Sequence, residues 1–308
     1  MKITHTYSIV AVSDDLSEIG VAVQSHWFAV GAICPWIIPG IGAIVTQSMV
    51  EISYGPQGLT LLEDGGTPQH ILPSLLHKDG EREFRQVAII NAQGKIATHT
   101  GKMCIAEAGH KVGHNYSVQA NMMINNSIWS AMADAFETSQ GKLAERLFAS
   151  LEAAQKAGGD LRGEQSAAMM VADNIRDDQP WSHFTTNLRI DDNIHPLKEL
   201  RRLLNLEGAY NMMNEGDSLI AKGNFSLSQK KYDAAEKLAP GNNEILFWNA
   251  VTLAKIGEMK KALRIFKDVF KKKPNWATLV GRLPESGLLP KDPNLMQEIL
   301  SVAPKRKS

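Results

Sequence analysis

Two short apolar segments near the start of the chain, separated by a turn, restrict its first element to a β-hairpin. Residues 6–12 and 18–24 are rich in Val, Ile and Ala, with polar side chains interleaved, a pattern typical of strands. The pair Asp14 and Asp15 between them tolerates turn geometry. We therefore expect two adjacent antiparallel strands. The first begins with the hydroxyl of Thr6, a candidate nucleophile.

Strand and helix patterns continue over the first two thirds of the chain. Further strand signals cover residues 41–47, 85–91, 95–100, 104–109, 116–120, 166–173 and 186–191. Helical periodicity covers residues 55–64, 67–77, 125–138, 141–157 and 195–205. Two sheets between two helical layers are the simplest packing of this order. With 308 residues, 44% of them hydrophobic, the chain is long enough to bury one large core and a smaller one.

Several segments, in order, resemble a bacterial family known only as domain of unknown function ten-twenty-eight. They include TYSIVA (6–11), EIGVAVQSHWFAVGA (18–32), GIGAIVTQS (40–48), FRQVAIINAQGKIATHTG (84–101) and AGGDLRGEQSAAMMV (157–171). The resemblance runs to about residue 206. It implies an α+β fold, a four-layer αββα sandwich like that of the N-terminal nucleophile (Ntn) hydrolases. It implies less about chemistry, because one fold hosts many activities.

The last hundred residues change character and become Lys-rich and helical after Gly208. Pro240 and Pro274 lie 34 positions apart, and equal offsets from them align Gly216 with Ala250, Leu219 with Leu253, Tyr232 with Phe266 and Ala235 with Val269. Small residues at a helix crossing, bulky residues around it and a proline after the second helix are what a tetratricopeptide helix pair needs. We therefore expect an all-α tetratricopeptide-like module, with repeats at 209–242 and 243–276, a terminal helix at 291–301, and domains at 1–207 and 208–308.

Two repeats are too few to bury a continuous core alone, so we expect them to pack on the front domain, a protein partner or the terminal helix. Residues 208–308 hold 17 of the 33 basic and 10 of the 33 acidic residues, which leaves 16 and 23 for residues 1–207. This asymmetry fits docking of the two parts or an acidic partner, and solvated helix faces are the simpler explanation. The basic residues form no nucleic-acid motif, so we expect no DNA or RNA partner.

The cysteines and the one long uncharged segment indicate where the protein resides. Cys34 and Cys104 are the only cysteines and form no C-x-x-C motif, as expected where thiols stay reduced. The start of the chain has no signal-peptide pattern, so we expect a cytoplasmic protein. Residues 27–45 carry no charge and are nearly long enough to cross a bilayer. Pro35 and Pro39 interrupt this run, which fits a strand, a loop and a second strand better than a membrane span.

An Ntn hydrolase uses the hydroxyl or thiol of its first residue as the nucleophile and the α-amine of that residue as the general base. The resemblance places this nucleophile at Thr6, so the mechanism requires a cut between His5 and Thr6. Without the cut, Thr6 is an ordinary strand threonine. Gln24 stands where proteasome-like members of the wider fold have an acid, and no lysine lies between Lys2 and Lys78. The proteasomal arrangement of charges is therefore absent.

Amide and hydroxyl side chains are abundant at the predicted strand ends instead. Such groups hold small polar ligands or donate to an oxyanion, and they equally satisfy loop backbone. Arg162 is suited to clamp a substrate carboxylate, unless it pairs only with Asp160. His99 is a candidate acid or base near neutral pH, although a single strand histidine is more often structural. The candidate substrate-binding residues are Gln24, Ser25, Gln47, Thr100, Gln119, Asn121, Asp160, Arg162 and Gln165.

The leading hypothesis is Ntn-type hydrolysis of an amide bond in a small polar metabolite or peptide, with Thr6 as the nucleophile and Asp160 and Arg162 fixing the substrate. Assistance to the oxyanion is expected from Gln47, Gln119 or Asn121. The competing hypothesis is a non-catalytic ligand-binding or scaffold protein whose helical repeats recruit a protein partner. A third is an uncleaved enzyme with His99 as base. His110 and His114 have i,i+4 spacing, but Gly109 and Gly113 make a helix there unlikely and no acidic ligand is near in sequence, so we expect no metal. We expect no cofactor, because no phosphate-binding motif is present. An exposed strand edge or repeat face would suit a homodimer, but no feature of the sequence selects one.

Overall fold

The structure, a computed structural model, describes residues 3–304. It divides into two compact units, Met1–Leu203 and Leu204–Ser308. We predicted domains at 1–207 and 208–308, whose outermost residues lie outside the described range. Among the described residues, no helix combines the length and the apolar composition that a bilayer crossing requires.

Two antiparallel sheets form the first unit. One has the order β1 (Ile3–Thr4), β5 (Gly42–Met49), β6 (Arg85–Asn91) and β7 (Ile96–Thr100), and β4 (Pro35–Ile38) also pairs with β5. The other has the order β11 (Phe184–Ile190), β10 (Ser166–Asp173), β3 (Glu18–Ser25), β2 (Thr6–Val12), β9 (Tyr116–Ala120) and β8 (Gly109–Gly113). The predicted hairpin is confirmed, because β2 and β3 pair from Thr6 and Ser25 to Val12 and Ile19.

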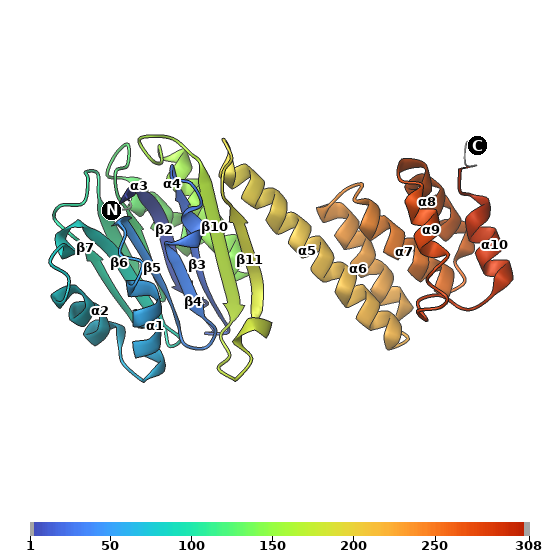
Figure 1. The fold of residues 1–308 in the computed structure, drawn as a ribbon, viewed down its shortest axis with the longest axis horizontal. Helices are drawn as coiled ribbons and strands as arrows, with labels where there is room; N and C mark the ends of the chain where they lie inside the picture. Colours follow the sequence, from blue (N-terminus) through green and yellow to red (C-terminus); the bar gives the residue numbers. More distant parts are fainter. Residues whose placement is uncertain (1–2, 305–308) are drawn as a thin grey trace. The chain divides into compact units, whose positions relative to one another are not determined.

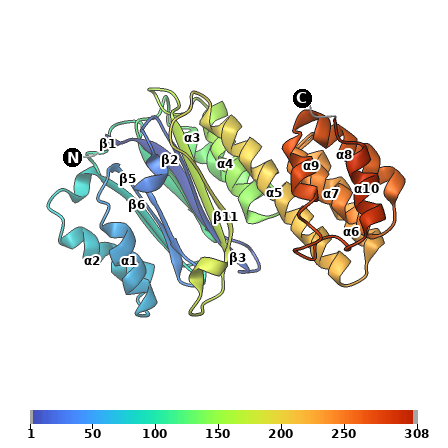
Figure 2. The same cartoon turned by 45° about the vertical axis from the view of Figure 1, so that its right-hand side comes forward.

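Helices cover the outer face of each sheet, as Figures 1 and 2 show. The sheet with β5 carries α1 (Tyr54–Glu63) and α2 (Pro68–His77), and the sheet with β2 carries α3 (Ile128–Thr138) and α4 (Leu143–Lys156). Buried Val and Ala side chains of both sheets, among them Val10, Val21, Val45 and Ala88, fill the space between them. The burial of this apolar surface holds the layers together. The unit is therefore a mixed α+β structure, with short 3₁₀ turns at Val30–Ala32, Arg82–Phe84 and Pro180–Ser182.

One predicted strand is displaced. A strand was expected at 104–109, but residues 101–108 form a loop and β8 begins at Gly109. The backbone amides of this loop bond outside the sheet: Met103 donates to the carbonyl of Glu83 over 2.8 Å, and Cys104 donates to that of Gly101 over 3.1 Å. These amides are therefore not available to a sheet.

The second unit is helical. It contains α6 (Phe225–Leu238), α7 (Asn243–Lys255), α8 (Met259–Lys272), α9 (Asn275–Val280) and α10 (Pro293–Ser301), and α5 (Pro196–Ala221) runs into it from the first unit. Its core contains Phe247 and Phe266, whose ring centroids lie 6.0 Å apart. The helix predicted at 195–205 was too short, since α5 continues through Gly208 to Ala221. A Cβ at Gly208 would lie 3.3 Å from Leu238, so this glycine allows α6 to pack closely against α5.

Candidate functional site

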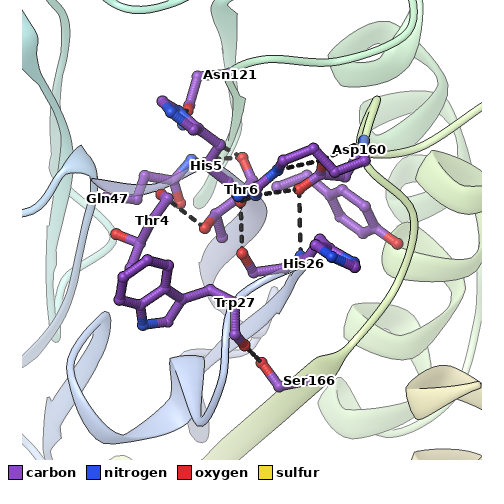
Figure 3. A network of polar contacts seen from close by, with 12 residues as sticks. Thr4, His5, Thr6, His26, Trp27, Gln47, Asn121, Asp160 and Ser166 are labelled. Atoms are coloured by element: carbon purple, nitrogen blue, oxygen red, sulfur yellow. Dashed lines mark hydrogen bonds and ion pairs between the residues drawn. The ribbon is translucent and has the colours of Figure 1, made fainter. Parts of the chain in front are cut away.

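The peptide bond between His5 and Thr6 lies where the chain passes from one sheet to the other. Thr4 pairs with Ser48 in the sheet of β5, whereas Thr6 pairs with Ser25 in the sheet of β2. Thr4 and Thr6 are fully buried, and the side chain of His5 is buried beside them. Figure 3 shows this crossing and the polar side chains around it. The candidate nucleophile therefore lies buried where the two sheets meet.

Two side chains donate hydrogen bonds to the carbonyl oxygen of His5. Ser25 donates from Oγ over 2.5 Å, and Arg162 donates from Nη2 over 3.0 Å. Asp160 fixes the guanidinium through two bonds, from Nε to Oδ1 over 3.0 Å and from Nη2 to Oδ2 over 2.7 Å. The carboxylate of Asp160 is itself buried and accepts from the backbone amide of His26. Donors held in this way stabilise negative charge that develops on a carbonyl oxygen.

The hydroxyl and the carbonyl of Thr6 both have defined partners. Its Oγ1 donates to the carbonyl of Thr4 over 2.9 Å. Its carbonyl accepts from Nε2 of Gln47 over 3.0 Å and from the backbone amide of Asn121 over 3.2 Å. The nitrogen of Thr6 is part of a peptide bond in this chain, so it has no lone pair available for base catalysis.

Buried amides from both sheets connect Thr6 to its surroundings. Nε2 of Gln47 and Nδ2 of Asn121 both donate to Oε1 of Gln86, over 2.7 and 2.8 Å. Ser8 donates to Oε1 of Gln47 over 2.6 Å, and Gln119 donates to Ser8 over 2.7 Å. A buried network with these mutual bonds holds its members in one arrangement. Gln86 was missed in the sequence, although a Gln within the apolar run RQVAIIN was a signal of a buried polar role.

Among residues 3–304, several buried polar atoms on or next to the strands around Thr6 have no hydrogen-bond partner. They are Nε2 of His5, Nδ1 of His26 and both amide atoms of Gln24. Burial lowers the pKa of His5, the hydrogen bond with Asn121 partly opposes this shift, and the charge of Arg162 adds to it. The imidazole of His5 is therefore neutral near pH 7.

The structure separates some of the predicted site residues from Thr6. Adjacent residues of a strand point to opposite faces, so Gln24 lies on the face away from Ser25, the face that α4 covers through Leu147 and Gly20. His99 pairs with Val87, whose side chain packs with α1 and α2. His99 is therefore on the face turned away from Thr6, and its Nε2 contacts the carbonyl of Arg82 over 2.9 Å.

The remaining predicted residues lie at the margins of the site. Thr100 accepts from Nε2 of Gln86 over 2.9 Å and contacts Nδ1 of His110 over 2.8 Å. The side chain of Gln165 donates to Asp192 over 3.1 Å, and its backbone amide donates to the carbonyl of Ser25. Within residues 3–304, no group of three or more His, Cys, Asp and Glu side chains is arranged to hold a metal ion.

The fold and the site define a mixed α+β protein with a polar centre between two antiparallel sheets. Residues 6–200 match a family of unknown function, DUF1028, and the chain belongs to this family. The chain is similar to the crystal structure of a DUF1028 protein, SPO2555 from Silicibacter pomeroyi. The two share 29% sequence identity with a TM-score of 0.59, and the match covers 65% of this chain and 84% of the other chain. No curated protein matches the chain.

Proposed function

We propose that the protein is an Ntn-type amidohydrolase that acts on an amide bond of a small polar metabolite or peptide, with Thr6 as the nucleophile after a cut between His5 and Thr6. The observation that supports this proposal is the pair of donors, Ser25 and Arg162, on the carbonyl oxygen of His5. This is the carbonyl that the hydroxyl of Thr6 must attack to release its own amine. The two sheets with helices on their outer faces suit the αββα architecture of this enzyme class.

The first step is self-cleavage. Oγ1 of Thr6 attacks the carbonyl carbon of His5, and the electron pair moves onto the carbonyl oxygen, where Ser25 and Arg162 stabilise it. Collapse of this intermediate breaks the bond from carbon to the nitrogen of Thr6. The proton of the hydroxyl ends on that nitrogen, which becomes the free α-amine. Water then hydrolyses the ester, which restores the hydroxyl of Thr6 and leaves a carboxylate on His5.

The cleaved enzyme repeats this chemistry on its substrate. The α-amine of Thr6 accepts the proton of its own hydroxyl, which attacks the substrate carbonyl. The substrate oxygen takes the position of the His5 oxygen, between Ser25 and Arg162. Asp160 fixes the guanidinium of Arg162, so this donor stays in place for the substrate oxygen. Gln47 and Asn121 hold the carbonyl of Thr6. The predicted roles thus change: Arg162 and Ser25 serve the oxyanion, and the amides position the nucleophile.

The intact mass and the N-terminal sequence of the untagged protein test this proposal. We expect a chain that begins at Thr6. Thr6→Ala should retain His5, because no hydroxyl is left to attack. Thr46→Ala is the matched control, since Thr46 is also a fully buried strand threonine and donates to the carbonyl of Glu51. A wild-type chain that still carries His5 after long incubation would contradict the mechanism.

The second candidate function is recruitment of a protein partner by the helical unit, whose helix pairs resemble tetratricopeptide repeats. A groove of about 850 Å³ between α6, α7 and α8 favours it. Leu246, Leu253 and Ile265 supply apolar surface, Asp233 and Glu236 supply acidic groups, and Lys261, Arg264, Lys271 and Lys272 supply basic groups. This mixture suits an extended peptide segment that carries both charges.

Charge reversal tests this second function. We expect Arg264→Glu combined with Lys271→Glu to lose a protein that co-purifies with the wild-type chain, because both residues line the groove. Lys78→Glu, an exposed lysine of the first unit, is the control. Equal retention by both variants, measured by quantitative mass spectrometry, would contradict a role for the groove.

A further inference from the structure

We propose that residues 3–5 occupy the acyl side of the substrate site, so that the substrate is an extended peptide with a neutral hydrogen-bond donor, such as a His side chain, on the residue whose carbonyl is attacked. This inference rests on the proposed function, because it takes the bond between His5 and Thr6 as the first bond that the site cleaves. The carbonyl of His5 already lies between the two donors, Ser25 and Arg162. The residues attached to that carbonyl therefore show where an acyl group binds.

The backbone of this segment binds as a short strand. Ile3 pairs with Met49 and Thr4 pairs with Ser48 along β5, while β4 pairs with β5 from Gly42 to Val45. Departure of β1 would leave the Ser48–Met49 part of this edge unpaired. Such an edge binds an extended peptide through main-chain hydrogen bonds. Ser48 has a φ of 71°, an uncommon conformation for a residue other than glycine and one that occurs often at ligand sites.

The side chain of His5 indicates what the first pocket accepts. Nδ2 of Asn121 donates to Oε1 of Gln86 over 2.8 Å, which identifies Oδ1 of Asn121 as the acceptor that faces His5. Nδ1 of His5 lies 2.7 Å from this Oδ1, so it carries the proton. The pocket therefore requires a donor. A carboxylate in the same place would set two acceptors against each other, and burial disfavours any charged side chain there.

The second pocket is small and polar. Thr4 is fully buried, and its Oγ1 donates to the carbonyl of Ser48 over 3.2 Å. The thiol of Cys34 lies 3.7 Å from Oγ1 of Thr4. Burial raises the pKa of Cys34 to about 12, so the thiol stays protonated and donates to this oxygen. A hydroxyl side chain satisfies both neighbours, and we expect Thr or Ser at this position of the substrate.

Three peptides that differ at one position test the pockets. The protein that begins at Thr6 is used, released by self-cleavage or, failing that, by removal of an N-terminal ubiquitin fusion. The substrates are acetyl-Ile-Thr-His-aminomethylcoumarin and its counterparts with Gln or Glu in place of His. We expect kcat/KM to fall roughly 10- to 100-fold from His to Glu, because a buried acceptor loses its donor. Gln should lie between them, since its amide also donates.

Calorimetry with the free acids of the same peptides separates this inference from the proposed function. Preferential binding of Ile-Thr-His over Ile-Thr-Glu without any hydrolysis would support the pockets and overturn the hydrolase. Hydrolysis of other amides without binding of Ile-Thr-His would overturn the pockets and leave the hydrolase standing. Equal binding of the His and Glu peptides would overturn the donor requirement. The melting temperature of the Thr6 protein is measured alongside, so that a loss of fold is recognised.

Discussion

Ser25 is the residue whose role a single substitution isolates most clearly. It is fully buried, and its Oγ donates to the carbonyl oxygen of His5 over 2.5 Å. We expect Ser25→Ala to slow self-cleavage by about 10²- to 10³-fold, because one donor to an oxyanion contributes a factor of this size. Arg162 remains as the second donor, so some cleavage persists. A time course of the intact mass measures the rate.

Ser117→Ala is the matched control for this substitution. Ser117 is also a fully buried strand serine, but it donates to Gln119 and contacts Thr98, not His5. We expect a cleavage rate close to that of the wild type. If the two variants cleave equally fast, Ser25 does not stabilise the oxyanion.

His5 links stability to pH. Burial lowers the pKa of His5 below its ordinary value of 6.5, so the unfolded chain binds more protons than the folded one as the pH falls through that value. The free energy of unfolding therefore decreases as the pH falls from 6.5 to the folded pKa, and it is greatest at higher pH. We expect urea midpoints of the uncut Thr6→Ala chain to fall on acidification. Burial and the neighbouring His99 also lower the pKa of His110, which contributes in the same direction.

A second substitution assigns the effect to His5. We expect His5→Gln, added to Thr6→Ala, to weaken the dependence on pH, because the amide of Gln donates to Asn121 and does not titrate. His110 contributes to the dependence that remains, together with carboxylates whose pKa is lowered in the folded chain, such as Asp79. An unchanged dependence would show that His5 contributes none of it.

The side-chain alternation of strands explains which site residues the sequence could predict. Ser25, Gln47 and Asn121 were expected near Thr6 from their places at strand ends, and each contacts residue 5 or 6. Gln24 and His99 were expected there too, but each points to the opposite face from its neighbour in the strand. Strand ends alone do not give the face, because the register of each strand within its sheet decides it.

At the scale of the element, the start of α7 depends on one side chain. Oδ1 of Asn242 accepts from the backbone amides of Glu244 over 2.9 Å and Ile245 over 3.3 Å. We expect Asn242→Ala to lower the stability of the helical unit by about 1 kcal/mol, because an N-cap side chain contributes this much. Chemical denaturation followed through a probe in that unit measures it.

Asn243→Ala provides the control for the cap. Asn243 is the next residue, and its Oδ1 is buried with no hydrogen-bond partner in the described part of the chain. Its removal breaks no hydrogen bond to that oxygen, and we expect a smaller loss than for Asn242→Ala or a slight gain. If both variants lose the same stability, the effect belongs to the helix end in general and not to the cap.

The elements that the sequence predicted best are those with strong local signals. Residues 6–12, 85–91, 116–120 and 166–173 combine apolar content with turn signals, and all are strands with these bounds. The loop at 101–108 and the length of α5 were missed because tertiary contacts help to decide them: the bond from the amide of Met103 to the carbonyl of Glu83, and the close approach of Gly208 to Leu238. Local sequence patterns do not reveal contacts between residues that are far apart in the chain.

At the scale of the whole molecule, each of the two units has its own core, and different parts of α5 contribute to each. Leu197 and Leu200 are buried on the part of α5 within the first unit, whereas Ala209 and Met213 pack with Tyr232 in the second. Within residues 3–304, no other helix or strand spans the boundary at 203/204. If each core unfolds as its own cooperative unit, a cavity in one should destabilise that unit alone.

Phe270→Ala and Phe148→Ala test this division from its two sides. Phe270 is fully buried in the second unit, where its ring stacks on Phe266 at 5.3 Å between centroids, and Phe148 is buried on α4 in the first. Each substitution should cost about 3–5 kcal/mol, a large share of the stability of one domain. Hydrogen exchange should therefore rise only in the unit that carries the cavity. The two ends of α5 should also respond differently. The amide of Leu200 should exchange faster in Phe148→Ala, and the amide of Met213 should exchange faster in Phe270→Ala. A uniform rise along α5 in either variant would show that the helix couples the two cores into a single cooperative unit.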